Sequence, residues 1–134
     1  MLTLELKMLC ASIVLGLIHI LVAAHAASLQ RGYRWAAGPR DEPVAALHGV
    51  AGRLARALDN FRETFPFFAA LVLAIEVTGK HSAVSAWGSL LYFGARLAYL
   101  PAYALGIFLL RSLIWNVATA GIILLLVALV ETRA

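Results

Sequence analysis

Four long apolar runs constrain the fold of this chain more than any other feature of its sequence. The runs cover approximately residues 9–27, 54–77, 84–107 and 113–130. Each is close to the roughly 20 residues that a helix needs to cross about 30 Å of hydrocarbon. A helix is also favoured because it satisfies its backbone hydrogen bonds within one segment. The sequence therefore predicts an all-α integral membrane protein, a bundle of four transmembrane helices over about residues 4–29, 51–79, 82–108 and 111–131.

The composition agrees with this class and excludes others. Of the 134 residues, 63% are hydrophobic and only 13% are charged, which excludes an ordinary soluble domain and a disordered chain. One membrane domain, residues 1–134, uses the whole length, so any chemistry must lie within the bundle or at its rim. The first run is long for a signal peptide and is preceded by Glu5 beside Lys7, so we expect a retained helix.

The distribution of basic residues predicts the orientation in the membrane. The first connection, about residues 30–50, is rich in arginine and in helix breakers, and the third connection carries Arg111. Lys7, Lys80 and Arg133 lie on the opposite side. By the positive-inside rule, the first and third connections are cytoplasmic and both termini are outside. The net charge of +4 comes without a basic run interleaved with aromatic residues, so nucleic-acid binding is not expected.

A polar stripe enters the second apolar run. Arg53, Arg56, Asn60 and Glu63 fall within an arc of about 80° on one face of a helix. A carboxylate and an amide are costly in hydrocarbon unless they meet partners, and such residues are functional candidates by default. We expect Glu63 to pair with Arg96 of the third helix or with another nearby arginine. Such a pair could form part of a ligand site or simply hold the two helices together.

The third helix carries a second stripe. Tyr92, Arg96, Tyr99 and Tyr103 are spaced i, i+4, i+7 and i+11, again on one helix face. Tyrosines at helix ends often form an interfacial belt, which is the alternative interpretation. This row instead runs along several turns and includes an arginine that needs a partner, which favours a network between helices.

The remaining polar residues give weaker indications. Asp59 and Arg62 lie off the first stripe and are expected to pair with another helix or subunit, whereas Glu76 and Lys80 have the i, i+4 spacing of a surface ion pair. Cys10 is the single cysteine, so no disulfide within the chain is possible. The four histidines have no metal-ligand spacing, and no metal is expected: His19, His25, His48 and His81. Interior glycines indicate close helix packing: Gly16, Gly88, Gly94, Gly106 and Gly121.

These side chains indicate the chemistry of a ligand without naming it. Several arginines beside an asparagine, a glutamate and tyrosines suit a small molecule that bears carboxylates, an amine and amides, because arginine pairs bidentately with carboxylate. A cation near a thiol also lowers the pKa of that thiol and raises its thiolate fraction.

The segment from Arg53 to Phe67, RLARALDNFRETFPF, resembles the second-helix signature of the MAPEG family, the membrane-associated proteins in eicosanoid and glutathione metabolism. The third-helix segment from Ala95 to Tyr103, with the following Arg111-Ser112, is also similar to that family. With the length and the four-helix layout, the resemblance covers nearly the whole chain, and it is closest to small bacterial members.

The resemblance implies a homotrimer in the bacterial inner membrane, with glutathione as cosubstrate bound between neighbouring subunits near the cytoplasmic side. Arg56, Asn60 and Glu63 match glutathione-binding positions of the second helix, and Tyr99 and Tyr103 match ligand-contacting positions of the third. Arg53 and Arg96 of the two stripes complete the expected thiol-binding set. Arg111, with Ser112, is similar to the arginine region proposed to activate the thiol, and Arg31 matches a basic residue at the end of the first helix.

Two departures from the family pattern bear on catalysis. The link from Tyr103 to Arg111 is about one residue shorter than in some relatives, and Leu58 stands where some catalytic members carry a polar residue. The predicted function is a membrane-bound glutathione-dependent transferase or peroxidase acting on lipophilic electrophiles. The alternatives are a non-catalytic binding or scaffold protein of the same fold, and a small transporter with Glu63 as its essential carboxylate.

Overall fold

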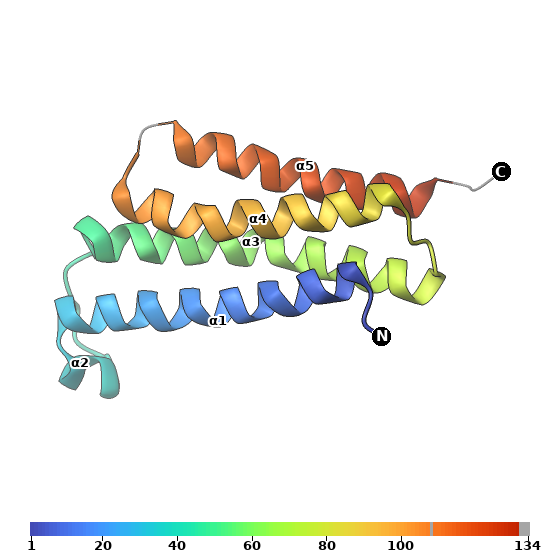
Figure 1. Cartoon of the computed structure of the whole chain (residues 1–134). Helices are drawn as coiled ribbons and strands as arrows, with labels where there is room; N and C mark the ends of the chain where they lie inside the picture. The colour runs from blue at the N-terminus through green and yellow to red at the C-terminus, as the bar shows by residue number, and fades with distance from the viewer. Residues whose placement is uncertain (108, 132–134) are drawn as a thin grey trace.

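Four long helices make up most of the computed structural model, which describes residues 1–107 and 109–131. They are α1 (Leu4–Arg31), α3 (Gly49–Thr78), α4 (Ala83–Leu105) and α5 (Leu110–Val130), and a short helix, α2 (Tyr33–Ala37), lies between the first two. The long helices run side by side (Figure 1). The α1–α3 and α4–α5 connections share one end, and the N-terminus and the α3–α4 connection lie at the other (Figure 1).

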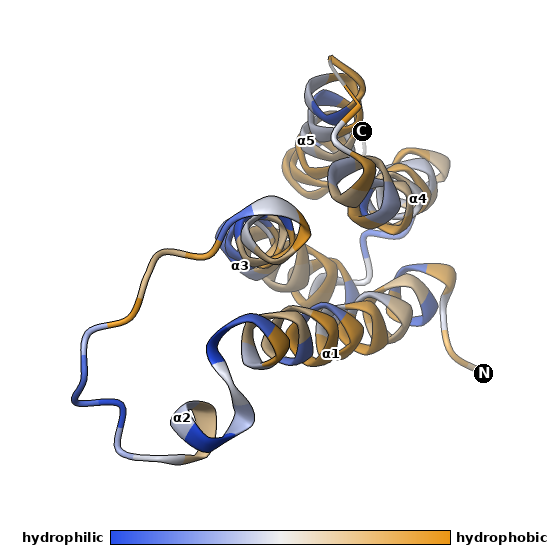
Figure 2. Ribbon diagram, turned by 90° about the vertical axis from the view of Figure 1, so that its left-hand side faces the viewer, coloured by the Kyte–Doolittle hydropathy of each residue, from blue (hydrophilic) through white to orange (hydrophobic). Residues whose placement is uncertain are grey.

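The observed boundaries lie within three residues of the predicted ones, and the predicted end of the third helix at residue 108 lies outside the described residues, as does Arg133. The sequence does not predict helix α2, because the glycines around it indicate only helix breakers. Gly32, with φ of 92°, ends α1 and directly precedes α2, and Gly38 follows α2. The first connection therefore contains one helical turn as well as loop (Figure 2).

Local sequence signals explain most helix ends. Thr3 precedes α1 and its hydroxyl accepts a backbone N–H of the first turn, while Ser82 and Ser85 form a reciprocal capping box at the start of α4. Gly79 and Gly106 end α3 and α4 with φ of 65° and 70°, a left-handed conformation that glycine adopts without steric cost. Thr3 and Ser82 therefore mark where helices begin, and Gly79 and Gly106 mark where helices end.

The bundle is built from two helix pairs. Helix α1 packs on α3, and α4 packs on α5, while α1–α4, α3–α4 and α3–α5 contacts join the pairs. Within the described residues the backbones of α1 and α5 do not come close to each other, as Figure 2 shows. Phe68 and Tyr92 stack with ring centroids 4.0 Å apart at the centre of the core, beside the fully buried Val72, Ile75 and Leu125.

The closest approach of α4 and α5 occurs at two glycines. A Cβ placed on Gly121 would lie 2.7 Å from the carbonyl oxygen of Gly88 and 2.8 Å from the backbone nitrogen of Tyr92. A Cβ on Gly88 would lie 2.8 Å from the carbonyl oxygen of Gly121. The prediction of close packing is confirmed at both positions. It is wrong at Gly94, where a Cβ would meet nothing within 4 Å.

Two helices, α1 and α5, are long and apolar enough by length and composition to cross a membrane. Among the described residues, α3 and α4 do not meet the same criterion. Charged residues occupy much of the first half of α3, and α4 carries Arg96, serines and tyrosines. The predicted membrane-crossing segments are therefore supported for the first and fourth long helices. A four-span bundle and a trimer remain predictions.

Candidate functional site

A cavity of about 410 Å³ opens between α3, α4 and α5, near the end of the bundle that holds the α4–α5 connection. Each helix contributes residues one turn apart, so one face of each helix lines the cavity. The lining comprises Arg56, Asp59, Asn60, Glu63, Tyr99, Tyr103, Arg111, Ser112 and Trp115. Most of the predicted site residues are thus brought together in one place, and their roles in binding and catalysis remain predictions.

Two arginines converge on one phenol at the cavity wall. The hydroxyl oxygen of Tyr103 accepts hydrogen bonds from Arg56 Nε and from Arg111 Nη1, each at 3.2 Å. The Arg111 guanidinium also lies 5.4 Å from the centroid of the Tyr103 ring. Tyr103 is buried, whereas both arginines are exposed. The phenol therefore holds two cations from α3 and α5 side by side while their remaining N–H groups stay available to an anion.

Arg53 lies beside this cavity and does not line it. Its Nε donates a 2.9 Å hydrogen bond to the carbonyl of Ala104 in the last turn of α4, a favourable place for a cation. With Arg56, Tyr103 and Arg111 it lines a neighbouring hollow of about 310 Å³. Three arginines thus form a continuous basic wall at this end of the bundle.

Arg96 lies behind the cavity wall and is fully buried. Its Nη1 donates to Asn60 Oδ1 and its Nη2 donates to Thr64 Oγ1, both at 2.6 Å. The guanidinium also lies 5.6 Å from the ring centroid of Tyr92 and 5.3 Å from that of Tyr99, within range of a cation–π interaction. The predicted network between the second and third long helices is present, with Arg96 at its centre.

Glu63 was expected to pair with Arg96 or with another nearby arginine, and among the described residues no ion pair within 4.0 Å joins Glu63 to any arginine. The charge of Glu63 still acts on Arg96 from a longer distance. Asn60 and Thr64 are four residues apart and both face α4, whereas Glu63 is rotated by about 100° from Thr64 on the same helix. Glu63 is exposed and faces the cavity. Arg96 thus supports the wall through Asn60, and Glu63 is left to meet a ligand or another chain.

The cavity also contains two residues that were not predicted for the site. Trp115 lies one turn after Arg111, and this i, i+4 spacing could have identified it. Asp59 lines the cavity next to Asn60 and forms an exposed ion pair with Arg62 of its own helix, at 3.8 Å. The expected pairing of these two residues with another helix or subunit is therefore not seen in the single chain.

The predicted surface pair of Glu76 with Lys80 is also wrong. Lys80 Nζ donates a 2.7 Å hydrogen bond to the carbonyl of Leu129 in α5. Glu76 instead accepts a hydrogen bond from the hydroxyl of Thr3, and its carboxylate lies 3.7 Å from His81 Nε2. The short α3–α4 connection turns the chain so that the lysine reaches α5 and not its own helix.

Replacing Asn60 with alanine is expected to destabilise the protein by about 2 kcal/mol, because hydrogen bonds to charged groups are stronger than neutral ones. The buried Arg96 would lose the side-chain acceptor of its Nη1 group. Thermal unfolding in detergent measures the effect. Asn116→Ala is the control, since Asn116 is exposed and, within the part of the chain that the structure describes, its amide bonds the Ser112 carbonyl of its own helix and no other group. Equal melting temperatures for the two variants would contradict the supporting role of Asn60.

The charges of the cavity define the ligand that it suits. Arg56 and Arg111 offer cationic donors, Asp59 and Glu63 offer carboxylates, and Asn60 offers a partly exposed amide. Such a wall matches a zwitterion with carboxylates at one end and an ammonium group at the other. A volume of about 410 Å³ lies within the range of small-molecule sites.

The sequence model of the MAPEG family matches residues 8–130, nearly the whole chain. No curated protein matches the sequence. The matched range includes every residue of the cavity.

Proposed function

Because this chain belongs to the MAPEG family and is a membrane protein, we propose that it is a glutathione-dependent transferase or peroxidase acting on lipophilic electrophiles. The observation that carries the proposal is the pair of arginines held by Tyr103 in a cavity that also offers carboxylates and an amide. Glutathione is a zwitterionic tripeptide, and its charges and amides complement these groups.

The two ends of the tripeptide would bind different parts of the wall. Arg56, close to Arg53, suits a carboxylate, because guanidinium and carboxylate form paired hydrogen bonds. Glu63 or Asp59 suits the ammonium group, and the Asn60 amide suits a peptide group of the ligand. Arg96 takes no direct part in this proposal and keeps the Asn60 side chain in place.

Arg111 and Ser112 would act on the thiol. A guanidinium beside sulfur stabilises the thiolate and so raises its fraction at neutral pH. The Ser112 hydroxyl, on the next residue of the same helix, could donate a hydrogen bond to the sulfur. The thiol proton leaves to solvent, the thiolate forms a bond to the electrophilic carbon, and the leaving group departs with the electron pair of the bond that breaks. Tyr99 and Trp115 offer aromatic surface for an apolar substrate.

The same proposal includes the assembly. Arg56, Glu63, Arg111 and Ser112 are exposed in the single chain, so a neighbouring subunit could cover the ligand from outside. We propose a homotrimer in the bacterial inner membrane, with the cavity near the cytoplasmic side. The apolar outer surface of α1, for example at Val14, Leu17 and Leu21, is available for lipid, through which a lipophilic substrate could arrive.

The first test is thermal unfolding of the detergent-purified protein with and without millimolar glutathione. At a ligand concentration of 100 times the dissociation constant, binding adds about 2.7 kcal/mol of stability, which is a clear shift in melting temperature. We expect this shift in the wild type and its loss in Arg56→Ala. Arg34→Ala is the matched control, because Arg34 is an exposed arginine outside the cavity. A wild-type protein that is not stabilised by glutathione would contradict the proposal and favour the scaffold alternative.

A further inference from the structure

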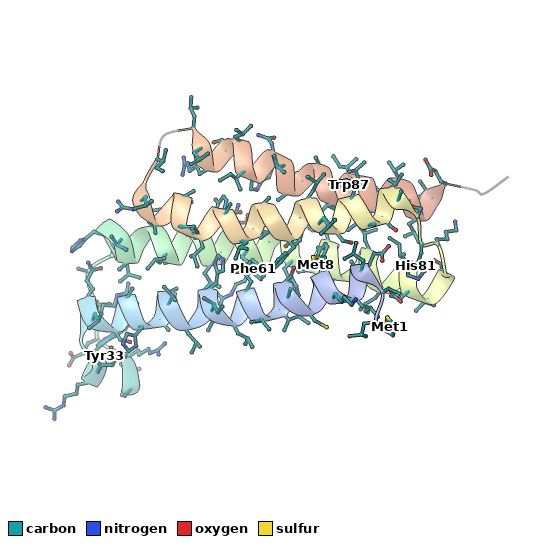
Figure 3. All side chains as sticks on the ribbon, viewed as in Figure 1. Met1, Met8, Tyr33, Phe61, His81 and Trp87 are labelled. Carbon is teal, nitrogen blue, oxygen red and sulfur yellow. The ribbon has the colours of Figure 1, made fainter. Side chains whose placement is uncertain are left out.

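A second cluster of ionisable side chains lies at the opposite end of the bundle from the cavity. Glu5 comes from the first turn of α1, Glu76 from the end of α3, and His81 from the α3–α4 connection. Figure 3 shows His81 at the end of the bundle where the chain begins. His81 Nδ1 lies 3.5 Å from Glu5 Oε1, and His81 Nε2 lies 3.7 Å from Glu76 Oε2. One donor atom from each residue lies within 4.8 Å of the other two.

Neighbouring hydroxyl groups hold both carboxylates in position. Ser85 of the α4 capping box donates to Glu5, and Thr3 at the start of α1 donates to Glu76. Glu5 is only 4% exposed, although it lies near the chain terminus. Hydrogen-bonded carboxylates of fixed orientation are typical of metal sites, where outer partners orient the ligands.

The charges of this cluster are unbalanced. Two carboxylates, one of them buried, converge on one imidazole, and a buried carboxylate is costly unless a cation compensates it. Lys7 and Lys80 are the nearest lysines in the sequence. Lys80 Nζ donates to the carbonyl oxygens of Leu129 and Glu131, and among the described residues no ion pair joins Lys7 to either carboxylate. A divalent cation between the three side chains would neutralise both carboxylates.

We propose that Glu5, Glu76 and His81 bind a divalent first-row transition-metal cation, with Zn²⁺ as the best fit. Mg²⁺ and Ca²⁺ prefer oxygen ligands, whereas imidazole nitrogen suits zinc and its neighbours. Donor atoms on a tetrahedral Zn²⁺ lie roughly 3.3 Å apart, given metal–ligand distances of about 2.0–2.1 Å. The separation of 3.5 Å between His81 Nδ1 and Glu5 Oε1 is close to that value. An imidazole binds a metal through one nitrogen, so the 3.7 Å contact of Glu76 with the other nitrogen, Nε2, is not a ligand–ligand distance of this site. A Glu76 oxygen lies within 4.8 Å of the other two donor atoms and would move closer to complete a set of three ligands, which leaves a fourth position open.

The bound cation would join three segments that are far apart in sequence. Glu5 anchors the start of α1, Glu76 the end of α3, and His81 the entry to α4. The spacing of the histidines in the sequence does not indicate this site, because its ligands come from three distant segments. The site is separate from the cavity, so its occupancy does not depend on the proposed function. In the competing arrangement, a protonated His81 bridges the two carboxylates without any metal. That arrangement predicts no response of the protein to Zn²⁺.

The experiment uses the full chain in detergent, purified without a histidine tag and stripped with a chelator. Adding Zn²⁺ should raise the melting temperature with one ion bound per chain, and Mg²⁺ at the same concentration should not. Glu76→Gln and His81→Asn should each weaken Zn²⁺ binding at least about tenfold. Loss of an outer-shell partner alone weakens metal binding by about that factor, and these two residues are direct ligands in the proposal. The matched controls Glu42→Gln and His25→Asn change exposed residues elsewhere and should bind as the wild type does.

Titration with Co²⁺ separates loss of the ligand set from loss of the fold, because Co²⁺ in a protein site absorbs visible light with a ligand-dependent spectrum. Glu76→His keeps a ligand at this position, so it should retain binding with a changed spectrum. Two results would overturn the proposal. One is a wild-type protein with neither a thermal response to Zn²⁺ nor Co²⁺ absorption bands. The other is Glu76→Gln and His81→Asn proteins that fold and bind Zn²⁺ as tightly as the wild type.

Discussion

Replacing Arg111 with alanine is expected to lower kcat/KM for conjugation of glutathione to an aromatic electrophile by about 100-fold, the usual effect of losing one donor to a developing anion. Under the proposed function, Arg111 is the cation beside the sulfur, and α5 carries it into the cavity next to Ser112. Its hydrogen bond to Tyr103 fixes the guanidinium at the wall. Without the Arg111 guanidinium, less of the bound thiol is thiolate at neutral pH. The rate is measured by the absorbance of the conjugate.

Two variants make the Arg111 result interpretable. Arg111→Lys keeps the positive charge but loses the planar guanidinium, so it should retain part of the rate. Arg34→Ala should conjugate as the wild type does, since Arg34 lies in α2 outside the cavity. The ultraviolet absorbance of enzyme-bound thiolate should fall in Arg111→Ala in parallel with the rate. An Arg111→Ala protein that folds and works at the wild-type rate would remove Arg111 from the mechanism.

Replacing Gly121 with alanine is expected to destabilise the protein by about 3 kcal/mol, at the upper end of overpacking effects. The added methyl group would lie 2.7 Å from the carbonyl oxygen of Gly88 and 2.8 Å from the backbone nitrogen of Tyr92. Backbone atoms cannot rotate away, so α5 would have to move off α4. The melting temperature in detergent is the measurement.

Gly94→Ala is the matched control for Gly121. Gly94 lies in the same bundle on α4, but a Cβ there meets nothing within 4 Å. Alanine in place of a helical glycine should leave the stability unchanged or raise it by about 1 kcal/mol. Similar melting temperatures for Gly121→Ala and wild type would show that α4 and α5 separate without cost, contrary to the contact described here.

The sequence alone predicted the helical class, the approximate ranges of the long helices and the residues that share one face. The spacing of Arg56, Asn60 and Glu63 was sufficient to group them, because helical periodicity fixes direction around an axis. Periodicity does not fix which neighbouring helix a given side chain faces. The sequence therefore offers Glu63 as one partner of Arg96, whereas Asn60 and Thr64 accept the hydrogen bonds of the guanidinium in the structure.

Contacts between distant segments could not be predicted for the same reason. The meeting of Glu5, Glu76 and His81 depends on where three helix ends converge in space, and no spacing in the sequence encodes that. Helix α2 was missed because Gly32 and Gly38 are helix breakers that here also bound a short helix. The family resemblance supplied the expected ligand and the trimer, neither of which follows from composition or periodicity.

The hydroxyl group of Tyr103 makes two arginines energetically interdependent. Because it accepts from Arg56 and Arg111 at once, removing either guanidinium leaves the other with a phenol whose second lone pair is free. Removing one guanidinium therefore changes the position and the hydrogen bond of the other. The free-energy changes of the two substitutions do not add. Ligand binding at α3 and thiol activation at α5 would then be coupled through one oxygen atom, so selection could not adjust one without altering the other.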